Sequence, residues 1–164
     1  MKLLHLGDLH LGKRVGEFSL LQDQRFVLGQ VVRLAAQHKV DAVLLAGDLY
    51  DKPVPPAEAV ELLDWFLTAL SAAGHTVLAV SGNHDSPERL AFASSLLQRA
   101  GVYIAGEVCA TPQRVTLTDE YGPVDITLLP FVKPAMMTPF LGERPANTDA
   151  AIAAALAALP PDTA

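Results

Sequence analysis

The chain has 164 residues, with 12 Lys and Arg against 18 Asp and Glu, and its formal net charge is -6. This length is typical of one domain, and a chain of this size buries enough surface to hold a core without disulfides. Hydrophobic residues make up 51% of the chain and charged residues only 18%, which excludes a disordered tail. The acidic balance argues against a protein that holds nucleic acid by bulk charge alone.

Membrane association and secretion are also not indicated. No apolar run reaches the roughly 18 residues that cross a bilayer, and His5 and Asp8 interrupt the first segment, so it does not resemble a signal peptide. The single cysteine, Cys109, excludes an internal disulfide and a cysteine-based zinc cluster, and it suits a reducing cytosol. We therefore predict a cytoplasmic protein with no membrane partner.

Short apolar runs alternate with longer helical patterns in the first part of the chain, which is typical of βαβ units. The runs 2–6, 42–46 and 76–80 are nearly continuous apolar segments, as expected of parallel strands with both faces covered. Helices are predicted over three ranges, which are 19–39, 56–73 and 87–100. Ser19 and Gln22 fit a capping box at the first of these, and Ser86 fits the cap of the third.

The pattern changes after Gly101. Strands are predicted over 102–105, 114–118 and 124–129, with the last two forming a hairpin. Four prolines predict a loop over 130–145. A helix is predicted over 148–159, with Ile152, Leu156 and Leu159 as its larger apolar anchors.

Three polar clusters each follow directly on one of the first three predicted strands. They are Gly7-Asp8-Leu9-His10, the segment Gly47 to Asp51, and Gly82-Asn83-His84-Asp85. Ligand sites in open parallel sheets lie just beyond the carboxyl ends of the strands. We therefore expect the three clusters to meet at one edge of the sheet.

These clusters offer carboxylate, amide and imidazole ligands but no thiolate. Such a set suits manganese, iron(II), zinc or magnesium rather than a structural zinc finger. In an extended segment, Asp8 and His10 would point the same way and reach one ion. Asp48 has two oxygens that could bridge a pair of cations, as in phosphoryl transfer. Each motif alone is ordinary turn chemistry, but the three in order after buried strands indicate a metal site.

The three clusters together resemble the motifs of the calcineurin-like metallophosphoesterases, and the residues that flank them resemble the SbcD nuclease family within that group. The residues that carry the resemblance are Asp8 to Gly12, Ala46 to Asp51, Pro55 to Ala59, Gly82 to Leu90 and Leu129 to Phe131. The resemblance implies an α/β calcineurin-like metallophosphoesterase fold, made of βαβ units and a mixed β-sandwich flanked by helices. It covers about residues 1–140, and the fold is expected to be incomplete at its C-terminus for the reason given below.

The resemblance also implies roles for individual residues. Four would bind metal, namely Asp8, His10, Asp48 and Asn83, with Asp48 shared between two ions. His84 would act as a catalytic residue beside the scissile phosphate, and Asp51 would orient His84. The implied cofactor is a pair of Mn²⁺ ions, with Mg²⁺ as an alternative. The carboxylates of Asp8, Asp48, Asp51 and Asp85 would then be offset by divalent cations or by His84.

The intact proteins of this family hydrolyse phosphodiester bonds in DNA repair, recombination and replication. They act as 3′-to-5′ exonucleases on double-stranded ends and as endonucleases on single-stranded DNA, together with the SbcC ATPase. The implied partners of this chain are therefore DNA, SbcC and a second copy in a homodimer. Four cations flank the loops and either meet DNA phosphates or are ordinary solvated side chains: Lys13, Arg14, Lys52 and Arg89.

One departure from the family pattern is clear. The family has three further histidines downstream, and none follows His84 in this sequence. Residues 1–164 are therefore expected to be the N-terminal part of a nuclease domain, inactive alone, with the remainder, the cap and the partner-docking region absent. Two alternatives stay open. One is a phosphoesterase acting on a small phosphodiester or nucleotide, and the other is a catalytically incomplete fragment that binds a partner.

Overall fold

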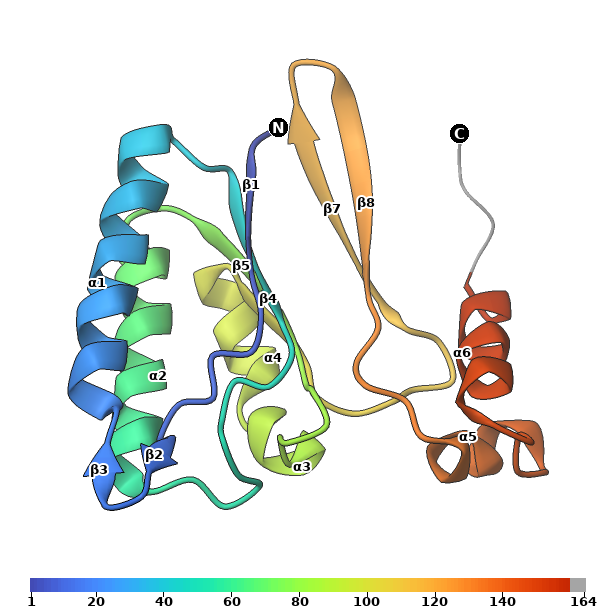
Figure 1. Ribbon diagram of the computed structural model, residues 1–164. Helices are drawn as coiled ribbons and strands as arrows, with labels where there is room; N and C mark the ends of the chain where they lie inside the picture. Colours follow the sequence, from blue (N-terminus) through green and yellow to red (C-terminus); the bar gives the residue numbers. More distant parts are fainter. Residues whose placement is uncertain (160–164) are drawn as a thin grey trace.

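A four-stranded parallel sheet with strand order β1-β4-β5-β6 forms the centre of the computed structural model, which describes residues 1–159 (Figure 1). Its strands are β1 (Leu3–Leu6), β4 (Ala42–Ala46), β5 (Thr76–Val80) and β6 (Val102–Ala105). Leu6 pairs with Leu45, and Ala46 pairs with Val80, so the carboxyl ends lie along one edge. The predicted parallel arrangement is confirmed.

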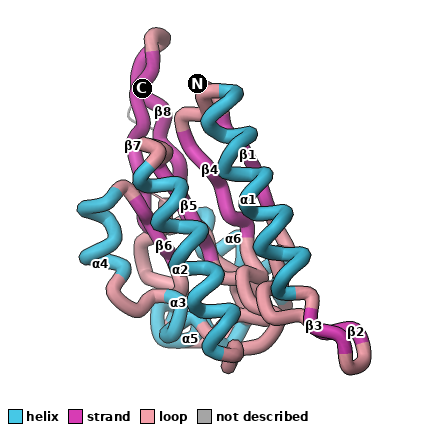
Figure 2. Tube along the Cα trace, turned by 90° about the vertical axis from the view of Figure 1, so that its left-hand side faces the viewer, coloured by secondary structure: helices cyan, strands magenta, loops and turns pink. Residues whose placement is uncertain are grey.

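Two helices cover one face of this sheet, α1 (Leu21–His38) and α2 (Ala57–Ala72), as Figures 1 and 2 show. Alternate strand residues such as Val43, Leu45 and Val77 face these helices, because successive side chains in a strand point to opposite faces. Phe66 of α2 is fully buried in this cluster. The largest core of the described residues therefore lies between the sheet and α1 and α2.

The opposite face carries the predicted hairpin, made of β7 (Gln113–Asp119) and β8 (Gly122–Leu128). Val115 and Leu128 of the hairpin form a smaller buried cluster with Leu78 and Ala105 of the sheet. The edge strand β1 differs from expectation, because Leu3 is 45% exposed and His5, on the same face of the strand, is exposed too. The prediction that both faces of this first strand are covered is wrong, because the hairpin packs on Leu78 of β5 and Ala105 of β6 and not on β1.

The first helix begins later than predicted. Ser19 belongs to a short hairpin of β2 (Arg14–Val15) and β3 (Phe18–Ser19), in which it pairs with Arg14. Leu20 is the N-cap residue of α1, and its side chain makes no capping hydrogen bond. Ser19 Oγ accepts from the N–H of Leu21 at 3.4 Å, not from the N–H of Gln22 as a capping box requires. The predicted capping box of Ser19 and Gln22 is therefore wrong, because strand pairing takes Ser19 out of the helix.

The helix predicted over 87–100 is broken into three short pieces. These are α3 (Pro87–Leu90), α4 (Ser94–Leu97) and a 3-10 turn (Gln98–Ala100). The break falls at Ala93, whose φ of 59° is left-handed and cannot continue an α-helix. The predicted cap is confirmed, since Ser86 Oγ accepts a hydrogen bond from the Arg89 N–H at 3.4 Å.

Four prolines predict a loop over 130–145, but part of this segment is helical. It contains α5 (Pro134–Leu141), in which Pro134 stands in the first turn, where the missing N–H costs no helical hydrogen bond. Met137 is buried and packs in a cluster with Ala151 and Ala155 of the last helix. The prediction failed here because this tertiary contact stabilises a helix that proline counting disfavours.

The last predicted helix is confirmed as α6 (Thr148–Ala157), but the prediction of which residues face inward is wrong. Ala151 and Ala155 are buried, whereas the predicted anchors Ile152 and Leu156 are 36% and 49% exposed. Small side chains face inward here, where α6 packs beside α5 (Figure 1). None of the helices within residues 1–159 is long and apolar enough to span a membrane. The end of the predicted domain, residues 160–164, lies outside the described residues.

Candidate metal centre

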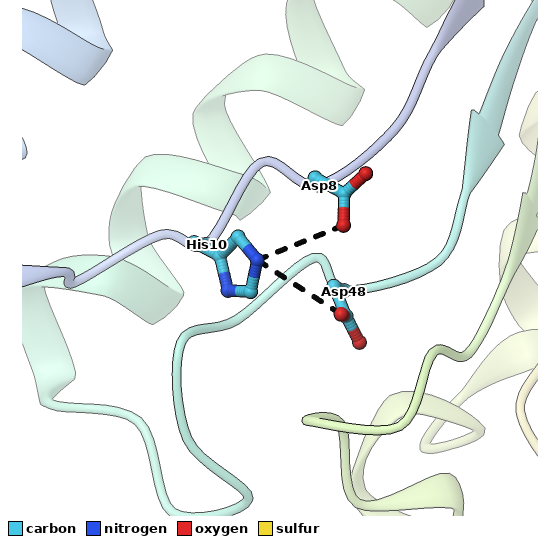
Figure 3. A group of neighbouring side chains, drawn as sticks. All are labelled: Asp8, His10 and Asp48. Carbon is cyan, nitrogen blue, oxygen red and sulfur yellow. Dashed lines mark ion pairs between the residues drawn. The ribbon is translucent and has the colours of Figure 1, made fainter.

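Three of the predicted ligands meet at the carboxyl edge of the sheet (Figure 3). His10 Nε2 lies 3.7 Å from Asp8 Oδ1 and 3.9 Å from Asp48 Oδ2. These distances are longer than a hydrogen bond. They match the spacing of about 3 to 4 Å between atoms that each lie about 2.0–2.2 Å from a shared ion. The geometry therefore suits three ligands around one cation.

The backbone of these three residues is unusual. Asp8, His10 and Asp48 have φ values of 55°, 43° and 48°, in the left-handed region that residues other than glycine rarely occupy. The expectation of an extended Asp8-x-His10 segment is therefore wrong. The two side chains still converge, because the loop turns sharply and is tied to its neighbour by hydrogen bonds. The His10 N–H donates to the Asp48 carbonyl at 2.9 Å.

The loops after β4 and β5 also approach each other very closely. A Cβ atom on Gly82 would lie 2.0 Å from Asp48 Oδ1, so only glycine permits this contact. Asp48 Oδ1 accepts a hydrogen bond from the His84 N–H at 2.9 Å. One carboxylate oxygen of Asp48 is thus fixed by the backbone, while the other faces His10.

Asp85 is a buried carboxylate whose role was not predicted. It is 6% exposed and accepts hydrogen bonds from the N–H groups of Leu49, Tyr50 and Gly82 at 3.1, 2.9 and 2.8 Å. Both carboxylate oxygens of Asp85 are thus held by backbone N–H groups, and the expectation that a divalent cation or His84 offsets its charge stays a prediction. Asp85 therefore ties the loop of Asp48 to the loop of Asn83 and His84.

Tyr50, which lies between the polar residues of the second cluster, points into the core instead of the site. Burial, together with the nearby carboxylates of Asp85 and Asp64, raises the pKa of Tyr50 to about 12. The phenol therefore stays protonated at neutral pH. Its contribution here is to packing rather than to proton transfer.

The two residues predicted to be catalytic lie beside the ligand group. The rings of His84 and His10 are edge to face, with centroids 4.9 Å apart. His84 Nδ1 lies 3.0 Å from the backbone carbonyl of Asp51, whereas the Asp51 carboxylate lies 3.6 Å from His10 Nδ1. Asp51 thus contacts His84 through its main chain and His10 through its side chain.

Asn83 lines the same cleft as Asp8 and Asp48. The cleft has a volume of about 460 Å³, and its lining also includes Phe131 and Ile152. The carboxylates thus face an open space that is large enough for a phosphate-bearing group. Three close ligands, with Asn83 nearby, leave coordination positions open, as in catalytic metal sites. The residues present therefore fit a hard divalent cation.

Comparison with known proteins agrees with this geometry. The model of the family described as calcineurin-like phosphoesterase matches residues 1–134, and the chain belongs to this family. Among individual proteins, it is 31% identical over 149 residues to the SbcD subunit of the nuclease SbcCD from Staphylococcus saprophyticus. It is 37% identical over 113 residues to the protein of the same name from Bacillus subtilis, and 36% over 105 residues to that of Staphylococcus epidermidis.

These matches cover different shares of the two chains. They include 90%, 68% and 63% of this chain, but only 39%, 29% and 28% of the three relatives. The chain thus spans about two fifths or less of the length of the curated relatives it matches. The predicted resemblance to SbcD proteins is confirmed.

Proposed function

We propose that this chain is the N-terminal part of an SbcD-type nuclease, which hydrolyses phosphodiester bonds in DNA with divalent metal. The observation that carries the proposal is the placement of His10 Nε2 within 4 Å of carboxylate oxygens of both Asp8 and Asp48. The relatives, which are named as nucleases, support DNA as the substrate. The proposal extends to 3′-to-5′ exonuclease and single-strand endonuclease activity.

The proposed roles of the residues come from the family resemblance, and the positions of the residues support them. Asp8, His10, Asp48 and Asn83 would hold the metal, and a bound divalent cation activates water and stabilises charge on a phosphate. His84 Nδ1 contacts the Asp51 carbonyl, which fixes the ring and leaves Nε2 as the atom that meets substrate. Through Nε2, His84 would protonate the leaving oxygen or stabilise the negative charge beside it.

The finer parts of the proposal rest on the family resemblance. The metal would be Mn²⁺, as a pair of ions in the complete protein, with Mg²⁺ as the alternative. The SbcC ATPase would be a partner, because the relatives are named as parts of SbcCD. A homodimer, a cytoplasmic location, and a role in DNA repair, recombination and replication complete the proposal. Residues 1–164 alone would be inactive, because they match only 39% or less of the length of these relatives.

A nuclease assay on the full-length protein with Mn²⁺ and duplex DNA tests the proposal. Asp48→Ala should lower the rate of cleavage by at least about 100-fold, because a lost ligand costs more than a lost outer contact. His84→Ala should also impair cleavage. The control is Glu61→Ala, which removes an exposed carboxylate on α2 and should leave the rate unchanged. Cleavage at the wild-type rate by both site variants would contradict the proposal.

A phosphoesterase acting on a small phosphodiester or nucleotide is the second candidate, because the cleft volume of about 460 Å³ is typical of small-molecule sites. Competition between duplex DNA and a small phosphodiester separates the two functions. DNA should inhibit hydrolysis of the small substrate at low concentration if the chain is part of a nuclease. A failure of DNA to compete would favour the small substrate.

A further inference from the structure

One side chain from α1 makes three hydrogen bonds to the loop that carries the candidate ligands. Gln24 Nε2 donates to the carbonyl of Leu9 at 3.1 Å and to the carbonyl of His10 at 2.8 Å. Gln24 Oε1 accepts from the N–H of Gly12 at 3.1 Å. Gln24 is thus bonded to backbone groups on both sides of His10.

Only an amide of this length supplies that combination of donors and acceptor. An amide nitrogen has two N–H donors and an amide oxygen accepts, whereas a carboxylate only accepts. With the amide reversed, its oxygen would face the carbonyls of Leu9 and His10 and its nitrogen would face the N–H of Gly12. The three contacts therefore fix the orientation of Gln24.

The loop needs such support because its backbone is strained. His10 has a φ of 43°, and unfavourable conformations of this kind persist only when the surrounding structure enforces them. Helix α1, which carries Gln24, is itself held in place, since its residues Leu28 and Val31 are buried in the main core. Gln24 therefore links a well-packed helix to the loop that turns the His10 ring toward Asp8 and Asp48.

We propose that Gln24 is a positioning residue, which holds His10 in the geometry that the metal requires. The inference rests on the proposed metal site, although Gln24 itself would not contact the metal. Outer contacts that orient ligands are typically worth a factor of 10–100 in metal affinity. Nothing in the motifs around Asp8, Asp48 or Asn83 points to Gln24, which lies on a helix between the first two of them.

The decisive variant is Gln24→Glu, because positioning and simple electrostatics predict opposite results. An added negative charge near the site should strengthen binding of a cation, whereas loss of both donors to the Leu9 and His10 carbonyls should weaken it. We expect the affinity for Mn²⁺ in a calorimetric titration to fall by about 10- to 100-fold. Gln22→Glu is the matched control, with the same charge change at an exposed position of the same helix turn. It should bind Mn²⁺ at least as tightly as wild type.

A second variant, Gln24→Met, removes all three hydrogen bonds without adding charge. It should weaken Mn²⁺ binding similarly and speed amide hydrogen exchange at Gly12, whose N–H loses its acceptor. Wild-type Mn²⁺ affinity in both Gln24 variants, even with a lower melting temperature, would overturn the inference and leave the proposed function standing. If Asp48→Ala binds Mn²⁺ like wild type, the proposed metal site fails instead. The exchange rate at Gly12 still decides between a Gln24 that holds the loop and one that does not.

Discussion

The two faces of the parallel sheet differ sharply in how they are built. The face under α1 and α2 carries the main core around Phe66, whereas the cluster on the hairpin face has only four buried hydrophobic residues within the described part of the chain. Asp8, His10 and Asp48 lie on the loops that lead from β1 toward α1 and from β4 toward α2. The hairpin instead leads into residues such as Phe131, which line the cleft. The candidate ligands thus lie at the sheet edge on loops that lead to the helices of the well-packed face, and the segment after the hairpin contributes to the lining of the cleft.

The largest expected effect is on the well-packed face. Phe66→Ala should lower the free energy of unfolding by about 4 kcal/mol, because it empties a large volume in the main core. Val115→Ala in the hairpin should cost less, about 1–2 kcal/mol, because it removes two methyl groups from a smaller cluster. Urea unfolding measures both values. An equal or larger loss for Val115→Ala would break the contrast between the two faces.

The next effect concerns the loops at the edge of the sheet. Asp85→Ala should lower the free energy of unfolding by about 3 kcal/mol, since three N–H groups lose their acceptor in a buried site. Asp85→Asn keeps one acceptor oxygen, so its stability should lie between those of Asp85→Ala and wild type. Thermal and urea unfolding of the three proteins provide the comparison. Wild-type stability of Asp85→Ala would show that this carboxylate does not hold the two loops together.

The smallest effect concerns the hairpin end, where the Met1 ammonium pairs with Asp119. The hydrogen bond to Asp119 raises the pKa of the ammonium, and the same bond lowers the pKa of Asp119. The stabilisation that comes from the raised pKa of the ammonium is fully present below about pH 8 and is lost as the pH rises further. The stabilisation that comes from the lowered pKa of Asp119 is lost as the pH falls below about 4. The melting temperatures of wild type and Asp119→Asn should therefore differ most near neutral pH. A difference that does not change with pH would contradict this pairing.

The parts that could be predicted from the sequence are those with local signals. Strands such as 42–46 and 76–80 are continuous apolar runs, and their positions were correct to the residue. Asp8, His10 and Asp48 were found because polar clusters at strand ends must share one edge of a parallel sheet. Their close approach is seen in the structure, while their roles remain a proposal.

The parts that could not be predicted depend on contacts between distant segments. Gln24 is one polar residue on an amphipathic helix, and nothing local shows that it reaches the His10 loop. Asp85 looked like one more carboxylate of the site, but burial against the N–H groups of another loop gives it a structural role. The helix at 134–141 forms because Met137 packs beside α6, which outweighs the local effect of proline.

The central claim is that Asp8, His10 and Asp48 together hold a divalent cation. A calorimetric titration of Mn²⁺ into the 164-residue chain tests it most directly. We expect weak, saturable binding at a single site, with little hydrolysis of DNA. This binding should be lost in Asp48→Ala and kept in Glu61→Ala. Unchanged binding in Asp48→Ala would contradict the claim, and two tight sites would contradict the incomplete ligand set proposed for these residues.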